Sequence, residues 1–300
     1  SGQVWSHTMS PTVTIIGKTR CKLGESPLWE PDSASLFWVD SVAPSIWRYD
    51  ATTGEQSEMP APDKIGSIVR GRPGELIAAM ADGIYRVELA TGSFQPIVRP
   101  SELTAHERLN DGKTDRSGRF VTGSITHGSS THVGKLFQFS RGGAYKVVPT
   151  EPIGISNAIC FSPAGDILYF ADSLRRMVWA YAYDTESGEV GARRDLIDTS
   201  SLGSAPDGAT VDAEGFLWIA LVQAQKIARV APDGRVDKVF DCPTPFPSCP
   251  AFGGAELDVL YVTSISNSGG MLVSEADQAG RLVQFQGLGV RGLAEARCSI

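Results

Sequence analysis

The stretch SAPDGATVDAEGFLWIAL, residues 204–221, decides the fold of this chain. It places Asp207 on a Pro-Asp-Gly turn and then alternates apolar with other residues over 209–213, as a strand with one buried face does. A second turn at Glu214-Gly215 leads into an apolar run with two aromatic residues, 216–221. Two such segments joined by a tight turn predict an antiparallel hairpin with the Asp207 carboxylate at its open end.

Hairpins of this kind recur along the chain with a period of roughly 40 to 50 residues, which is typical of propeller blades. The second, apolar strands are expected at residues 36–40, 76–80, 120–124, 168–172, 217–221 and 260–264. Helical periodicity is nearly absent. The sequence therefore predicts an all-β fold, a six-bladed β-propeller of four-stranded antiparallel blades. Residues 12–17, TVTIIG, precede the first unit, and we expect them to form the outer strand of the last blade and close the ring.

The length of 300 residues is compatible with a single closed all-β domain, and no linker interrupts the repeats. We expect one propeller domain over residues 11–300. Residues 1–10 are expected to be a disordered tail or a remnant foreign to the natural chain, which could begin at Met9.

Charge and cysteine usage narrow the classes of partner. A formal net charge of -7 without a Lys/Arg cluster argues against nucleic acid and anionic membranes, which need a concentrated positive field. No apolar run approaches bilayer length, and residues 1–9 lack the charged-then-apolar order that a secretory signal is expected to have. Five scattered cysteines fit a reducing compartment better than a disulfide framework. We therefore expect a cytoplasmic protein, a monomer or weak homodimer, with a small-molecule ligand.

The first strand of each unit lines the central channel of a propeller, so the residues at the starts of these strands should meet around one axis. These mouth residues are Glu25, Gly66, Asn110, Asn157, Asp207 and Cys249. Glu25, Asn157 and Asp207 together offer two carboxylates and an amide oxygen, which suit one hard divalent cation, Ca²⁺ first and also Mg²⁺ or Mn²⁺. An open site could also take Zn²⁺ or Fe²⁺. The alternative is that these turn-prone side chains bond only to local backbone.

Five segments in order resemble the successive signatures of the gluconolactonase/regucalcin (senescence marker protein) family. They are GESPLWEPDSASLFWVD from residue 24, RLNDGKTDRSGRFVTGS from 108, ISNAICFSPAGDILYFADS from 155, PDGATVDAEGFLWIA from 206 and CPAFGGAELDVLYVTS from 249. The resemblance covers most of the chain. It implies a six-bladed propeller that hydrolyses sugar lactones with one divalent metal in its channel.

The resemblance also implies roles for individual residues. Glu25, Asn157 and Asp207 correspond to the metal ligands of the family, and Arg108 and Asn110 to its substrate contacts. Some members carry an acidic substrate-binding residue shortly after a G-[TS]-[MI] segment, where this chain has Ile-Thr-His-Gly at 125–128. We expect His127 to make that contact instead, which leaves the identity of the sugar open.

In the chemistry that these parts support, the cation polarises the lactone carbonyl and acidifies a water molecule. Asp207 is the expected proton acceptor as well as a ligand. A metal-bound carboxylate is a poor base, so attack by a metal-bound hydroxide is the alternative. Arg108 could instead pair with Glu107 or Asp111 on a solvated loop.

Other polar residues have simpler interpretations. Asp111 is expected to be structural, and five carboxylates at strand ends are expected to cap turns: Glu30, Asp40, Asp115, Asp172 and Asp212.

Two rival functions are compatible with the same fold. One is hydrolysis of an organophosphate or aryl ester, since a fold does not determine the substrate. The other is a non-catalytic Ca²⁺-binding propeller.

Overall fold

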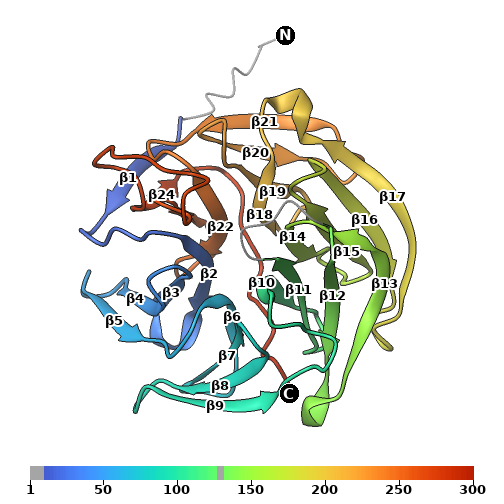
Figure 1. Cartoon of the computed structure of the whole chain (residues 1–300). Helices are drawn as coiled ribbons and strands as arrows, with labels where there is room; N and C mark the ends of the chain where they lie inside the picture. The colour runs from blue at the N-terminus through green and yellow to red at the C-terminus, as the bar shows by residue number, and fades with distance from the viewer. Residues whose placement is uncertain (1–9, 127–131) are drawn as a thin grey trace.

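The computed structural model describes residues 10–126 and 132–300 and consists of six four-stranded antiparallel sheets arranged in a ring (Figure 1). The sequence prediction of a six-bladed β-propeller is confirmed. In each blade the strands run outward from the axis in chain order, except in the last blade, which takes its outer strand from the N-terminal end.

The strand boundaries follow the predicted repeats. Blade 1 contains β2 (Gly24–Glu30), β3 (Ser35–Asp40), β4 (Ser45–Asp50) and β5 (Gln56–Pro60). Blade 2 contains β6 (Ile65–Arg70), β7 (Glu75–Met80), β8 (Ile84–Glu88) and β9 (Ser93–Val98). Blade 3 contains β10 (Glu107–Thr114), β11 (Phe120–Thr126), β12 (Gly134–Phe139) and β13 (Tyr145–Ile153). Blade 4 contains β14 (Ser156–Phe161), β15 (Ile167–Asp172), β16 (Met177–Tyr183) and β17 (Val190–Asp198). Blade 5 contains β18 (Pro206–Val211), β19 (Leu217–Leu221), β20 (Lys226–Val230) and β21 (Val236–Asp241). Blade 6 contains β22 (Pro247–Gly253), β23 (Val259–Ser264), β24 (Leu282–Gln286) and β1 (Thr12–Ile16).

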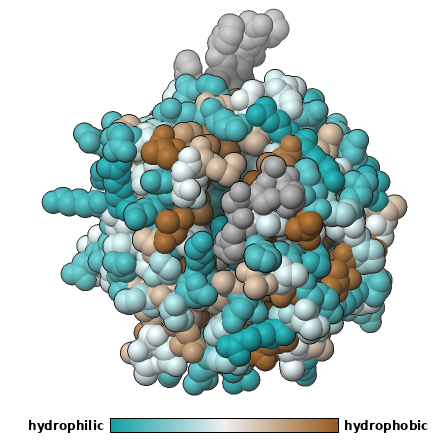
Figure 2. Space-filling model, in the orientation of Figure 1, coloured by the Kyte–Doolittle hydropathy of each residue, from teal (hydrophilic) through white to brown (hydrophobic). Residues whose placement is uncertain are grey.

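The helical content of the described chain is three short 3₁₀ turns, at Pro31–Ser33, Arg141–Gly143 and Thr199–Leu202. No helix in this part of the chain is long and apolar enough to cross a membrane. On the face shown in Figure 2, hydrophobic residues form small patches between hydrophilic ones, as is usual for a water-exposed protein surface.

The ring is closed by pairing between the two ends of the chain. Strand β1 pairs with β24 in antiparallel register, from Thr12 opposite Gln286 to Ile16 opposite Leu282. This confirms the prediction that the N-terminal strand completes the last blade. Closure leaves the propeller without an exposed break in its circle of blades.

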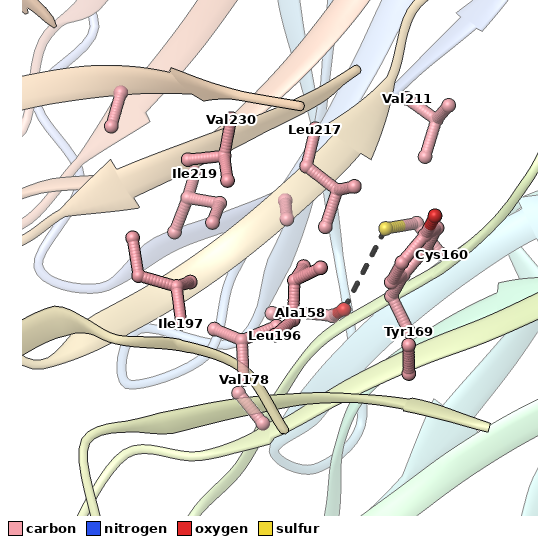
Figure 3. Close-up of a cluster of buried hydrophobic side chains, with 14 of the residues drawn as sticks. Ala158, Cys160, Tyr169, Val178, Leu196, Ile197, Val211, Leu217, Ile219 and Val230 are labelled. Carbon is pink, nitrogen blue, oxygen red and sulfur yellow. Dashed lines mark hydrogen bonds between the residues drawn. The ribbon is translucent and has the colours of Figure 1, made fainter. Parts of the chain in front are cut away.

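The hydrophobic core lies between neighbouring blades. Figure 3 shows one such cluster, in which Tyr169, Val178 and Ile197 of blade 4 pack against Leu217 and Ile219 of blade 5. Each blade has a neighbouring blade on both of its faces, so its second strand is apolar on both sides. This explains the continuous apolar runs of the second strands in the sequence. All five positions of β19 are buried, for example.

Each inner strand carries a β-bulge where it begins. In blade 1, Glu25 pairs with Val39 and Leu28 with Phe37, so β2 has one more residue than β3 over this interval. The inner strand also has one extra residue after Leu109, Asn157 and Pro206 in blades 3, 4 and 5, and after Ile65 and Pro247 in blades 2 and 6. A bulge locally redirects side chains. It therefore acts at the mouth position of every blade.

The pairing corrects one mouth assignment. Pro247 pairs with Ser264 at the position that Gly24 and Asp40 occupy in blade 1, so Ser248, not Cys249, is the counterpart of Glu25. The Ser248 hydroxyl donates to the Gly24 carbonyl of the adjoining blade. The equivalent position in blade 2 is a glycine, Gly66, for a steric reason. A Cβ there would lie 2.3 Å from the Leu109 carbonyl oxygen.

The C-terminal segment crosses the ring at the end where the inner strands finish (red in Figure 1). Gly292 forms a bridge with Asp212 after β18, the Arg70 guanidinium at the end of β6 donates to the Glu295 carbonyl at 2.8 Å, and the Ser299 amide donates to the Gly118 carbonyl at 2.9 Å. The segment thus ties blades 5, 2 and 3 together at the end away from the mouth residues.

Candidate active site

The predicted site residues meet in one cavity. A cavity of about 350 Å³ is lined by Glu25, Arg108, Asn110, Asn157 and Asp207, which come from the inner strands of blades 1, 3, 4 and 5. Its size suits a small molecule. A larger cavity of about 740 Å³ lies between blades 1 and 2 and has none of these residues in its wall.

Glu25 and Asp207 form a buried carboxyl pair. They are only 8% and 7% exposed. Burial, then the charge of Asp207 and a hydrogen bond with its carboxyl, raise the pKa of Glu25 well above the ordinary value. Burial also raises the pKa of Asp207, to about 7, against the opposing effect of the same hydrogen bond. The two carboxyls therefore titrate as a pair that holds on to protons at a pH where isolated carboxyls have lost them.

One oxygen of the pair is left without a partner. Asp207 Oδ1 is buried and finds no hydrogen bond among residues 10–126 and 132–300. A buried polar atom in this condition is costly unless something else satisfies it. A cation bound between the two carboxyls would supply the missing partner.

Both the nitrogen and the oxygen of the Asn157 side-chain amide form hydrogen bonds. Its Nδ2 donates to the Ser173 Oγ at 2.8 Å, and its Oδ1 accepts from Asn110 Nδ2 at 3.3 Å. Ser173 in turn donates to the Pro206 carbonyl at 2.6 Å, directly before Asp207. Ser173 therefore links two of the predicted ligands, and this sets the orientation of the Asn157 oxygen.

The residues fit a metal ion of a particular type. Within the described residues there is no group of three or more His, Cys, Asp or Glu side chains placed to hold a metal. The site offers two carboxylates and one amide oxygen, with an unsatisfied carboxylate oxygen among them. Such an all-oxygen set suits a hard divalent cation that keeps further positions for water or a ligand.

Arg108 and Asn110 lie beside this set. Arg108, 7% exposed, donates through Nη1 to Asn110 Oδ1 at 3.1 Å and to the Leu109 carbonyl at 3.2 Å. Burial lowers the pKa of Arg108 to about 10, opposed by the charge of Glu25, so the guanidinium stays charged at neutral pH. Asn110 Nδ2 donates to the Ser156 carbonyl at 2.8 Å.

The alternative in which Arg108 pairs with Glu107 or Asp111 on a solvated loop is wrong. The residue belongs to β10, and Lys135 Nζ lies 3.0 Å from the Glu107 carboxylate. Asp111 Oδ2 accepts from the Ile159 amide at 3.2 Å, in the next blade, which agrees with a structural role. Burial raises the pKa of Asp111, with Lys113 opposing.

His127 lies outside the described residues, so its predicted substrate contact stays a prediction. The neighbouring Ile125 lines the cavity.

The five strand-end carboxylates cap turns, as predicted. Asp40 Oδ1 accepts from the amides of Leu23, Val42 and Ala43, and Asp172 Oδ1 from those of Ile155 and Leu174. Glu30, Asp115 and Asp212 likewise accept from local amides in the turns that follow them.

Sequence reasoning missed four polar residues of the cavity wall. They follow second strands rather than beginning first strands: Ser173, Arg176, Gln223 and Ser268. Ser173 had a detectable signal, because Asp-Ser follows the second strand in both unit 1 and unit 4, at Asp40 and Asp172. Arg176 and Gln223 occupy no repeated pattern.

Comparison with known proteins gives one consistent result. The family model described as SMP-30/Gluconolactonase/LRE-like region matches residues 23–266. Pentonolactonase XacC of Haloferax volcanii is 34% identical over 89% of this chain and 90% of that protein. A 6-deoxy-6-sulfogluconolactonase of Pseudomonas putida is 30% identical over 85% of this chain and 88% of that protein. The solved structure of a luciferin-regenerating enzyme superposes with a TM-score of 0.91 at 26% identity and covers 97% of this chain and 100% of that chain.

Proposed function

Because the chain belongs to the SMP-30/gluconolactonase/LRE-like family, we propose that it is a lactonase that opens a sugar lactone to the aldonic acid with one divalent metal ion. The observation that carries the proposal is the buried, unpartnered Asp207 Oδ1 beside Glu25 and Asn157. Lactonases with sugar substrates among the relatives support the reaction class.

Glu25, Asn157 and Asp207 would hold the cation, with Ca²⁺ the first candidate and Zn²⁺, Mn²⁺, Mg²⁺ or Fe²⁺ as alternatives. When bound, a divalent cation would polarise the lactone carbonyl and acidify water. Asp207 would accept the proton of the attacking water, because its carboxylate lies in the cavity wall beside the other predicted ligands; a metal-bound hydroxide is the alternative nucleophile. Water oxygen bonds to the carbonyl carbon, the ring carbon–oxygen bond breaks, and the proton passes to the departing ring oxygen. The product is a hydroxy acid.

The remaining side chains would position the lactone. Arg108 Nη1 is occupied by Asn110 and the Leu109 carbonyl, and the other guanidinium N–H groups have no hydrogen-bond partner among the described residues, so they can reach a ring oxygen or hydroxyl. Asn110 fixes the orientation of Arg108 and contributes its own amide. His127 is proposed as a further substrate contact.

The decisive experiment measures proton release from a panel of aldonolactones. The chelated protein is compared with protein restored with Ca²⁺, Mg²⁺, Mn²⁺, Zn²⁺ or Fe²⁺, and each is repeated with Asp207→Ala. We expect turnover only with metal and intact Asp207. Unchanged rates after both chelation and substitution would overturn the proposal.

The same panel separates the rivals. Faster turnover of a phosphotriester or aryl ester than of any lactone would identify the second hydrolase. Metal binding without turnover would identify the non-catalytic Ca²⁺ binder, which the buried, cavity-facing Arg108 argues against.

We also propose that residues 11–300 act as one unit, in the cytoplasm, as a monomer or weak homodimer without nucleic-acid or membrane partners. The five cysteines are all free and buried, which supports a reducing compartment.

A further inference from the structure

A second arginine stands in the cavity wall, away from the carboxyl pair. Arg176 follows β15 in blade 4, and Gln223 follows β19 in blade 5. Arg176 Nη2 donates to Gln223 Oε1 at 3.2 Å, and the same oxygen accepts from the Ala205 amide at 2.9 Å. Gln223 is therefore anchored to the backbone and holds one edge of the guanidinium at the cavity.

The backbone under Arg176 is fixed as well. Its carbonyl accepts from the Thr199 amide at 2.8 Å and from the Thr199 hydroxyl at 3.2 Å. Its φ of 57° is left-handed, but Gln225, at the end of the corresponding turn of blade 5, has a φ of 56°. The conformation thus belongs to the turn, and the feature specific to residue 176 is its side chain.

No carboxylate of the described residues forms an ion pair with Arg176. Four charged side chains line the wall: Glu25, Asp207, Arg108 and Arg176. Arg108 interacts with Glu25, and the neighbouring Arg175 lies 3.5 Å from Asp172 and 3.7 Å from Glu151. None of the ion pairs between described residues includes Arg176. The pKa of exposed Asp198 is lowered mainly by the Ser200 amide and least by Arg176.

The surroundings of Arg176 favour an ion over hydroxyl groups. Besides Ser173, Gln223 and Ser268, the connections after the second strands of blades 4, 5 and 6 bring five apolar side chains to the wall: Leu174, Val222, Ile265, Met271 and Leu272. These side chains give a polyhydroxy chain no hydrogen bonds, whereas an anionic group can form charge-assisted bonds with the guanidinium. A divalent cation at the carboxyl pair would make the cavity more positive still, because Arg108 and Arg176 add two charges.

We propose that Arg176 selects lactones with an anionic group on the carbon chain remote from the ring carbonyl. This proposal rests on the lactonase function above. The group is a carboxylate, phosphate ester or sulfonate, each of which matches the planar donors of a guanidinium. Arg176 binds this group while Arg108 and Asn110 contact the lactone ring, and the opened product is a dianionic acid.

The test compares Arg176→Met and Arg176→Lys with the wild type on four lactones: neutral gluconolactone, and hexonolactones with a 6-carboxylate, 6-phosphate or 6-sulfonate. Arg175→Met is the matched control, because it removes the same charge from the same turn outside the cavity wall. We expect the wild type to favour at least one anionic lactone over gluconolactone by about tenfold or more in kcat/KM. Arg176→Met should abolish this preference while changing gluconolactone turnover by less than about threefold. Arg176→Lys should retain part of the preference, and Arg175→Met all of it.

A binding measurement keeps the proposal testable apart from catalysis. Titration of the ring-opened 6-carboxylate product, a diacid, into the wild type should show tighter binding than titration of gluconate, and Arg176→Met should remove the difference. Equal handling of all four lactones, or an equal effect of Arg176→Met on the neutral and anionic ones, overturns the proposal and leaves the lactonase function standing. No turnover of any lactone with Arg176-dependent binding of the diacid overturns the lactonase function alone.

Discussion

Strand β18 has a buried aspartate at its start and another directly after its end, and the two differ in one respect. Asp207 is 7% exposed and Asp212 0%. Asp212 accepts from the amides of Glu214 and Phe216 at 3.0 Å each and, through Oδ2, from Trp218 Nε1 and Arg229 Nε at 2.9 Å each. Asp207 Oδ1 accepts from none of the described residues. A buried aspartate whose oxygens all accept hydrogen bonds stabilises the fold, whereas a buried aspartate with an unbonded oxygen can bind a ligand.

The largest effect should follow the removal of the open carboxylate. We expect Asp207→Ala to reduce lactone turnover by roughly a thousandfold or more, equivalent to about 4 kcal/mol of transition-state stabilisation. The metal-free variant should unfold at the same or higher denaturant concentration than the wild type, since an unsatisfied buried group has been removed. Rates and urea unfolding curves check both parts. A large loss of metal-free stability would place Asp207 with the structural carboxylates.

The opposite pattern is expected for the other aspartate. Asp212→Ala leaves the buried Arg229 guanidinium without one of its carboxylates and two turn amides without an acceptor. The free energy of unfolding should fall by about 3 kcal/mol. The protein that remains folded at low temperature should keep its turnover per mole. Asp241→Ala, at an exposed position, is the control and should change little. Selective loss of activity in Asp212→Ala would contradict the comparison.

The metal-free pair should also make stability depend on pH. The pKa values of both carboxyls are raised, so the folded state keeps protons that the unfolded carboxyls lose near pH 4. The resulting stabilisation of the folded state is complete below the pKa of the unfolded carboxyls and is lost as pH rises through about 7. Between pH 5 and 6.5 the chelated protein should therefore lose about 2 kcal/mol for each carboxyl that stays protonated, relative to a Glu25→Gln/Asp207→Asn variant.

Metal addition gives the complementary measurement, because ligands must lose their protons before they bind a cation. At pH 6.5 the wild type should release about one to two protons per metal bound. Uptake of metal without proton release would mean that the pair is already ionised.

The smallest effect should come from the serine that joins two ligands. Ser173→Ala removes the bond from Asn157 Nδ2, and we expect metal affinity to fall about tenfold, or about 1.4 kcal/mol. Ser41→Ala is a matched control, since the Ser41 hydroxyl donates to the Ile65 carbonyl at 2.6 Å just as Ser173 donates to that of Pro206. Equal loss of affinity in both variants would show that the bond between blades, and not the contact with Asn157, sets the affinity.

The sequence predicted those parts of the molecule that repeat. Blade number, ring closure and the cavity positions of Glu25, Asn157 and Asp207 follow from the period, because equivalent strands start at equivalent places around the axis. The assignment in blade 6 was one residue off, at Cys249 instead of Ser248, since no polar motif marks the bulge there. The position of one residue in a bulge depends on backbone pairing, which the pattern of side chains does not record.

Contacts between distant segments were beyond sequence reasoning. Nothing near Glu107 in the sequence shows that Lys135 occupies its carboxylate and so leaves Arg108 to the cavity. Arg176 and Gln223 meet across two blades from turns that share no motif. Such pairs depend on where a turn ends and which side chains it turns inward, and both are settled only when neighbouring blades pack.

Ring closure has a consequence for synthesis of the protein on the ribosome. Strand β1 leaves the ribosome first, yet its partner β24 is made about 270 residues later, as the pairing of Thr12 with Gln286 requires. At about 5 to 20 residues per second, β1 waits roughly 15 to 55 seconds without its sheet. During this interval the nascent chain carries an unpaired strand whose Ile16 is buried only in the finished ring. Co-translational folding can therefore complete five blades, but the sixth must wait until β24 has been made.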